Sequence, residues 1–73
     1  MVSRQSYLNK LRELNYVFKS QLPRVDMYRK QGGTHRIFVR RVDLLSDEFV
    51  ASSLRQAGCR DDEIRSFLAA AKT

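Results

Sequence analysis

The sequence predicts one α+β domain, a small antiparallel sheet with an N-terminal helix and two C-terminal helices. Two patterns predict this class. Apolar residues recur at helical spacing near the N-terminus and in two C-terminal segments, and strand-forming runs flank the pair Gly32-Gly33. The 73 residues are expected to form a single domain, 1–73, with a small core.

The first predicted helix runs from about Ser3 to Ser20. Ser3 or Ser6 can cap its start by accepting a free backbone N–H. In an alternative, Asn15 takes a left-handed conformation and ends the helix, and an extended segment begins at Tyr16. The apolar residues at three- and four-residue steps are Tyr7, Leu8, Leu11, Leu14, Val17 and Phe18.

A β-hairpin is predicted after Pro23, which cannot donate a backbone hydrogen bond and favours an extended residue before it. Its strands are Arg24 to Lys30 and Thr34 to Val42. Gly32 and Gly33 are predicted as the two central turn residues, because the favoured two-residue turn requires positive φ at both positions. The resulting pairs are Gln31 with Thr34, Lys30 with His35, Arg29 with Arg36, Tyr28 with Ile37 and Met27 with Phe38.

Two features of this hairpin stay open at the level of sequence. A turn centred on Gln31 and Gly32 would instead place His35 opposite Tyr28 and shift every pair. Side-chain alternation also gives two faces, neither of them purely apolar, so either one could be covered by the helices. One face carries Val25, Met27, Arg29, Arg36, Phe38 and Arg40, and the other carries Asp26, Tyr28, Lys30, His35, Ile37 and Val39.

Two helices are predicted in the C-terminal part. Leu44 and Leu45 precede them and can pack or form a third strand. Ser46 is the expected N-cap of the first helix, and Gly58 suits the position just after its end. Asp61 is the expected cap of the second helix. The apolar faces are Phe49, Val50, Leu54 and Ala57 in the first helix, and Ile64, Phe67, Leu68 and Ala71 in the second.

Positive charge is concentrated in the N-terminal part of the chain. Residues 1–41 carry ten Lys or Arg and two acidic residues, a net charge of +8, whereas residues 42–73 carry four and six, a net charge of −2. This asymmetry favours a polyanionic partner, and nucleic acid over a membrane, because no long basic amphipathic helix is present. The alternative is a charged surface without a partner. A cytoplasmic protein is expected, since the N-terminus lacks the apolar segment of a signal peptide.

His35 is the candidate for catalysis. Near neutral pH an imidazole can accept a proton from a ribose 2′-hydroxyl, after which an acid must protonate the leaving 5′-oxygen. Lys30, Arg29 or Arg36 could neutralise the charge on the reacting phosphorus. A structural or merely exposed histidine is the alternative. No metal or cofactor is expected from a single His and a single Cys, and Cys59 is expected to be a small packing residue.

Two segments carry a resemblance to a known family. Arg29 to Phe38 (RKQGGTHRIF), followed by Leu54 to Gly58 (LRQAG), resembles the HicA family of bacterial toxins. The resemblance implies a fold similar to a double-stranded-RNA-binding domain, metal-independent cleavage of mRNA and a HicB antitoxin as partner. It also implies that Gly33-Thr34-His35 is the active-site motif, with His35 as general base and Thr34 as a positioning residue.

Two functions therefore stay open: a HicA-like endoribonuclease, and a non-catalytic RNA-binding module that uses the same basic face. A helix-turn-helix over Asp47 to Gly58 and Asp61 to Lys72 is disfavoured, because its second helix would meet DNA with three carboxylates. That acidic pair of helices suits a protein partner or oligomerisation better. The predicted RNA contacts are Arg29, Lys30, Arg36, Arg40 and Arg41, with Gly32 and Gly33 forming the turn.

Overall fold

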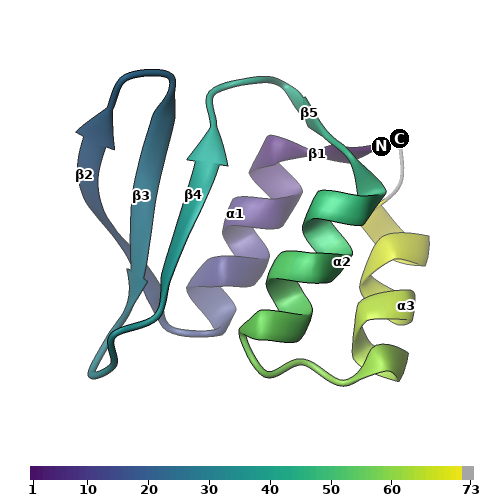
Figure 1. Ribbon diagram of the computed structural model, residues 1–73. Coiled ribbons are helices and arrows are strands. Elements are labelled where there is room, and N and C mark those ends of the chain that lie inside the picture. The colour runs from purple at the N-terminus through teal and green to yellow at the C-terminus, as the bar shows by residue number, and fades with distance from the viewer. Residues whose placement is uncertain (72–73) are drawn as a thin grey trace.

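The computed structural model describes residues 1–71, and over these residues the chain is an α+β domain with three helices and two antiparallel sheets (Figure 1). Strands β2, β3 and β4 form the larger sheet in that order, and β1 pairs with β5. Lys72, part of the helix-turn-helix hypothesis, lies outside the described residues. None of the helices in residues 1–71 is long and apolar enough to span a membrane. The elements are β1 (Val2–Ser3), α1 (Arg4–Glu13), β2 (Tyr16–Leu22), β3 (Val25–Lys30), β4 (Arg36–Arg40), β5 (Leu44–Leu45), α2 (Asp47–Gln56) and α3 (Asp61–Ala71).

Helix α1 is shorter than its main prediction. Asn15 has a φ of 68°, which ends the helical segment, and strand β2 begins at Tyr16. The predicted continuation to Ser20 is therefore wrong, and the alternative is confirmed. Ser3 caps the helix as predicted, because its Oγ accepts a hydrogen bond from the backbone N–H of Ser6 at 3.1 Å.

The third strand of the main sheet is β2. Leu44 and Leu45 do form a strand, but β5 pairs with β1 in a separate sheet, with Val2 opposite Leu45. The backbone N–H of Arg4 donates to the carbonyl of Asp43 at 2.9 Å, which ties the start of α1 to the segment before α2. Both helices thus begin at the same small sheet and run side by side (Figure 1).

The register of the hairpin between β3 and β4 is the predicted one. Arg29 faces Arg36, Tyr28 faces Ile37 and Met27 faces Phe38. Beyond the ladder, the backbone N–H of Lys30 donates to the carbonyl of His35 at 3.0 Å. Strand β4 covers Arg36–Arg40, so the predicted extension to Thr34 and Val42 is wrong.

The turn of this hairpin differs from its prediction. The backbone N–H of Gly33 donates to the carbonyl of Lys30 at 3.1 Å, so the central residues are Gln31 and Gly32. Of these two residues only Gly32 has a positive φ, of +79°. It occupies the third position of the turn, where glycine is favoured. The pairing does not shift, because residues 31–34 form a four-residue loop between the paired Lys30 and His35.

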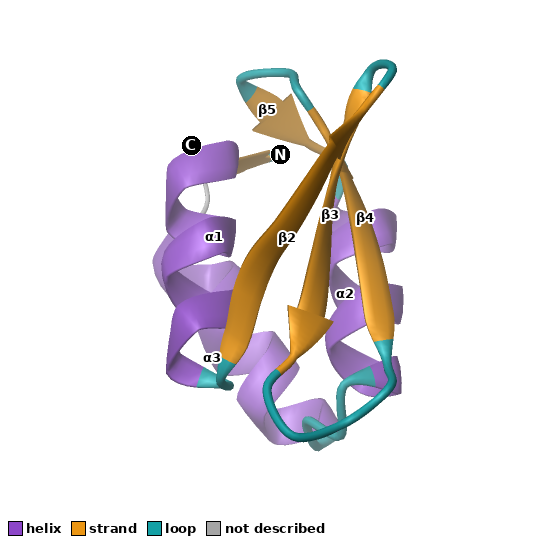
Figure 2. Cartoon of the chain, turned by 90° about the vertical axis from the view of Figure 1, so that its left-hand side faces the viewer, coloured by secondary structure: helices purple, strands orange, loops and turns teal. Residues whose placement is uncertain are grey.

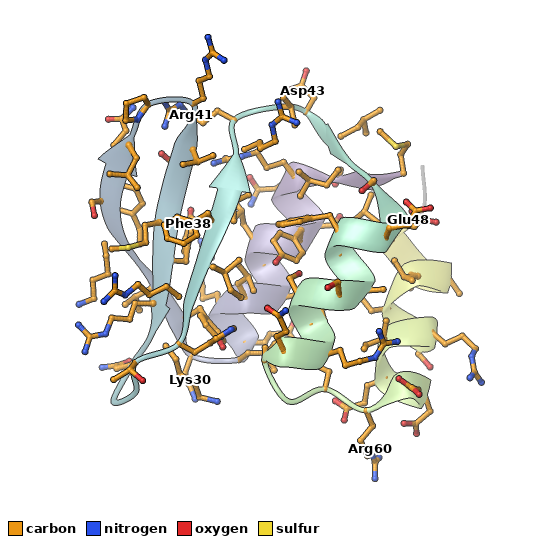
Figure 3. All side chains as sticks on the ribbon, viewed as in Figure 1. Lys30, Phe38, Arg41, Asp43, Glu48 and Arg60 are labelled. Atoms are coloured by element: carbon orange, nitrogen blue, oxygen red, sulfur yellow. The ribbon has the colours of Figure 1, made fainter. Side chains whose placement is uncertain are left out.

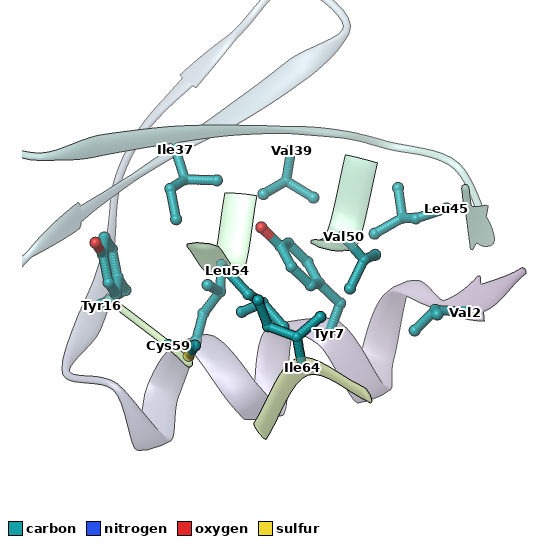
Figure 4. Packing of buried hydrophobic residues seen from close by; sticks show 11 residues of the cluster. Val2, Tyr7, Tyr16, Ile37, Val39, Leu45, Val50, Leu54, Cys59 and Ile64 are labelled. Carbon is teal, nitrogen blue, oxygen red and sulfur yellow. The ribbon is translucent and has the colours of Figure 1, made fainter. Parts of the chain in front are cut away.

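The helices cover the face that carries Tyr28, Ile37 and Val39. Ile37 is 4% exposed and Val39 is fully buried, and Figure 2 looks onto the sheet with the helices behind it. The opposite face of the sheet, called the outer face below, is open. The core beneath the sheet consists of Val2, Tyr7, Leu11, Tyr16, Ile37, Val39, Leu45, Val50, Leu54, Cys59 and Ile64 (Figure 4).

The C-terminal helices largely follow the sequence pattern. Ser46 caps α2 by accepting from the N–H of Phe49 at 3.1 Å. Gly58, with a φ of 100°, ends α2, and the next N–H, of Cys59, donates back to the carbonyl of Leu54 at 3.0 Å, as in a Schellman motif. Helix α3 begins at Asp61 itself, so the prediction of Asp61 as its cap is wrong.

Candidate nucleic-acid interface

A basic hollow lies at the hairpin end of the sheet. Its volume is about 340 Å³, and it brings together side chains from two strands and the turn. Strand β2 contributes Lys19, the extra residue at an irregularity where the pairing with β3 shifts between Phe18 and Ser20. Such a bulge re-aims a side chain relative to the regular alternation of a strand. The lining residues are Lys19, Arg29, Lys30, Gln31, Gly32, Gly33 and Thr34.

The turn that closes this hollow is held by several hydrogen bonds. The backbone N–H of Gln31 donates to the carbonyl of Asn15 at 2.8 Å, which fastens the turn to the start of β2. Arg29 donates from Nε to the carbonyl of Gly33 at 2.9 Å, so the guanidinium is oriented along the turn. Its two terminal nitrogens make no hydrogen bond within residues 1–71 and can meet an anion.

The cations of the hollow have no acidic partner. Within residues 1–71, no carboxylate lies within 4.0 Å of the charged groups of Lys19, Arg29 or Lys30. Arg29 also faces Arg36 directly across the strands, and both are exposed. Like charges in directly opposed positions destabilise a sheet. A bound anion would relieve this repulsion, so the arrangement favours a negatively charged ligand.

His35 lies at the start of β4 and is half-buried. Its Nδ1 is 2.6 Å from the hydroxyl of Tyr16, and the two rings meet edge to face with centroids 5.8 Å apart. Tyr16 is only 2% exposed, and burial raises the pKa of its hydroxyl. The phenol therefore keeps its proton at neutral pH, and Nδ1 of His35 is its one hydrogen-bond acceptor within residues 1–71.

This contact constrains what His35 can do. When the phenol donates to Nδ1, the neutral ring carries its own proton on Nε2. Nε2 is then a hydrogen-bond donor, not a base. The general-base assignment requires the other tautomer, in which Nδ1 donates to the phenol oxygen. Thr34 lines the basic hollow but makes no side-chain hydrogen bond to His35, so the structure does not join the two predicted catalytic residues through a direct contact.

The other predicted RNA-binding residues are spread along the sheet. Arg36 and Arg40 are exposed on the outer face. Arg41 instead forms an ion pair with Asp26 at 2.6 Å and donates to the carbonyls of Val25 and Leu22. Figure 3 shows Arg41 at the opposite end of the sheet from Lys30. Arg41 therefore holds neighbouring segments together and is not part of the basic hollow.

Lys19 was missed as an interface residue because the main prediction placed it in a helix. The alternative segment from Tyr16 could have placed it on a strand, but no residue pattern marks the bulge that directs it toward the turn. Cys59 is a buried free cysteine, and its burial raises the pKa of the thiol. No group of three or more His, Cys, Asp or Glu residues that could hold a metal ion occurs within residues 1–71.

Comparison of the chain with protein-family models, curated proteins and solved structures gives no match. The resemblance to the HicA family therefore rests on the segments around Gly33-Thr34-His35 and Leu54 to Gly58.

Proposed function

We propose that the protein binds RNA through the basic hollow at the hairpin end. The observation that carries the proposal is that three cations, Lys19, Arg29 and Lys30, line the hollow without a carboxylate partner within residues 1–71. Phosphate is the anion that occurs in a repeating array matched to such a surface. The choice of RNA over DNA comes from the HicA-like segments and from the small sheet with helices on one face, as in a double-stranded-RNA-binding domain.

A salt titration with matched charge variants tests the proposal. One variant, called the hollow variant below, combines Lys19→Ala, Arg29→Ala and Lys30→Ala. The control removes three exposed positive charges from the helical side, by substituting Arg55, Arg60 and Arg65 with alanine. Affinity for a labelled RNA oligonucleotide is measured by fluorescence anisotropy between about 50 and 200 mM salt.

The expected result follows from counterion release. Each lost phosphate contact lowers the slope of log affinity against log salt by about 0.7 for a single strand, so the hollow variant loses about 2 in slope and up to about 100-fold in affinity at 0.1 M salt. The control should change the slope little. Equal losses of affinity in the two variants would contradict the proposal. So would an affinity of the wild type for RNA that does not change with salt concentration.

A second proposal is that the bound RNA is cleaved without metal, with His35 as the proton-transfer residue. The observation that favours it is the 2.6 Å contact with Tyr16, which fixes the ring beside Thr34 and leaves Nε2 as its other polar atom. As an imidazolium, with Nδ1–H donating to the phenol oxygen of Tyr16, His35 would give its Nε2 proton to the leaving 5′-oxygen and return to the neutral ring. In the neutral ring with Nδ1 protonated, Nε2 would take the proton of the 2′-hydroxyl.

Expression in bacteria tests this second proposal. Growth arrest should require His35, so His35→Ala should abolish arrest while the purified variant keeps its far-UV circular dichroism and its affinity for RNA. Purified protein should cleave RNA in the presence of EDTA. Undiminished arrest by His35→Ala contradicts a catalytic role. A HicB-like antitoxin belongs to this proposal, and co-expression of the neighbouring reading frame should then restore growth.

A further inference from the structure

No helix or strand within residues 1–71 covers the outer face of the sheet. Its composition follows from the register of the three strands and the side-chain alternation along them. Phe38 is the most exposed apolar residue on this face, at 47%, and Leu22 follows at 37%. The side chains are Val17, Ser20 and Leu22 from β2, Val25, Met27 and Arg29 from β3, and Arg36, Phe38 and Arg40 from β4.

None of the nine side chains on the outer face is acidic. The nearest carboxylate along β3, Asp26, lies on the helix-covered face and is paired with Arg4 at 2.7 Å and Arg41 at 2.6 Å. The outer face thus has an apolar centre with cations at both ends. Arg29 and Arg36 form a pair at the hairpin end, and Arg40 lies at the other end of β4.

We propose that the outer face binds single-stranded RNA, with one base stacked on Phe38 and the backbone held by Arg36 and Arg40. This inference rests on the proposed RNA-binding function and extends it. Arg36 and Arg40 lie two residues before and after Phe38 on the same side of β4, about 6.6 Å away along the strand in each direction. Aromatic side chains between cations are how proteins hold single strands without regard to sequence.

A single strand fits this face better than the other occupants do. The bases of a duplex are stacked on one another, so a duplex cannot offer a free base face to Phe38. A second copy of the chain would bring Arg29, Arg36 and Arg40 against like charges. Arg29 lines the basic hollow and also belongs to the outer face, so one continuous strand can run from the hollow onto β4.

Substitutions of Phe38 test the stacking contact. Phe38→Ala and Phe38→Leu should weaken binding of a labelled single-stranded RNA at least about fivefold, the lower end for loss of one aromatic–base stack, and Phe38→Tyr should restore it. Phe18→Ala is the matched control, because Phe18 is 54% exposed and packs against Tyr28 on the other side of the sheet. It should change the affinity less than twofold.

A fluorescence measurement reports the same contact directly. The chain has no tryptophan, so Phe38→Trp and Phe18→Trp each introduce a single one. RNA should quench the emission of Phe38→Trp at saturation and leave that of Phe18→Trp nearly unchanged. Thermal unfolding of each variant, compared with the wild type, verifies that the sheet is intact.

The outcomes separate this inference from the proposed function. Loss of affinity in the hollow variant but not in Phe38→Ala or Phe38→Leu overturns the outer-face proposal alone. Equal weakening of single-stranded and duplex RNA by Phe38→Ala also overturns it. If the protein binds an acidic polypeptide such as poly-glutamate more tightly than RNA, and Phe38→Ala weakens that binding, the outer face would be assigned to a protein partner instead.

Discussion

Removal of the buried hydroxyl of Tyr7 should change how the stability of the protein depends on pH. Tyr7 is fully buried, and its hydroxyl is 2.6 Å from Oγ of Ser53. Ser53 donates its own proton to the carbonyl of Val50 at 3.1 Å, so the phenol is the donor in the bond with Ser53. Burial raises the pKa of Tyr7 to about 12.

The sign of the effect follows from linkage. The folded protein holds the phenolic proton more tightly than the unfolded chain, in which the pKa is about 10. The contribution of Tyr7 to stability is thus complete below pH 10 and is lost as the pH rises through the folded pKa of about 12. The total loss is about 3 kcal/mol, and about half of it has occurred by pH 11.

Tyr7→Phe should therefore be less stable than the wild type at pH 8 and about equally stable at pH 11. At pH 8 the variant lacks one buried hydrogen bond, worth about 1 kcal/mol. Between pH 8 and pH 11 the wild type loses about 1 kcal/mol that the variant cannot lose. Urea unfolding followed by far-UV circular dichroism at the two pH values measures the difference.

Ser53→Ala is the control for this comparison. It leaves the phenol of Tyr7 buried without its acceptor, so it should destabilise the protein at pH 8 by about 1–3 kcal/mol and keep the alkaline loss. A constant difference between Tyr7→Phe and the wild type at both pH values would refute the reasoning.

Two pairs of substitutions test the structural basis of the interface. Asp26→Ala removes a mostly buried carboxylate from two arginines and should lower the free energy of unfolding by about 2–3 kcal/mol. Arg55→Ala breaks an ion pair whose side chains are 61% and 73% exposed, so it should lower the free energy of unfolding by less than about 1 kcal/mol. Urea unfolding measures both variants, and equal losses would contradict a structural role for Asp26. Gly32→Ala should lower the free energy of unfolding by about 1–2 kcal/mol, because the φ of this residue is +79°. Gly33→Ala should be nearly neutral, because an added Cβ meets Lys30 no closer than 3.6 Å. Similar melting temperatures for the two variants would argue against the observed turn.

Local chemistry made several parts of the fold predictable. Ser3 and Ser46 could be identified as caps because a hydroxyl before an amphipathic run satisfies a free backbone N–H. Gly58 could be placed after a helix because its left-handed conformation disfavours other residues. The pairing of Arg29 with Arg36 followed from counting outward from the glycines, even though the turn itself is longer than predicted.

Features that depend on tertiary packing could not be predicted. Val17 and Phe18 continue the helical spacing of α1, yet Asn15 ends the helix before them and they lie on β2. The sequence predicts that a strand begins at Arg24, but β3 begins at Val25, and Arg24 has a φ of 67° in the turn after Pro23, a conformation that arginine seldom adopts. The bulge that brings Lys19 to the hairpin end depends on the pairing between strands and not on any local pattern.

The covered face of the hairpin decides how the candidate functions relate to each other. Because the helices bury Ile37 and Val39, the same alternation directs Arg36, Phe38 and Arg40 outward and turns His35 toward Tyr16. Binding through the hollow and the outer face then needs no contribution from the imidazole, whereas cleavage depends on it.

The hydrogen bond between Tyr16 and His35 allows a catalytic role of His35 to be distinguished from a structural one. If His35 acts through Nε2 while the phenol holds Nδ1, Tyr16→Phe should impair cleavage. It should leave the affinity for RNA unchanged, because it keeps the ring, whose centroid lies 5.9 Å from Nζ of Lys30, and removes only the hydroxyl that contacts His35. A merely structural hydrogen bond would instead lower the melting temperature of Tyr16→Phe without separating cleavage from binding. Measuring both activities in this one variant therefore distinguishes an RNA-cleaving site from a histidine that only anchors the start of β4.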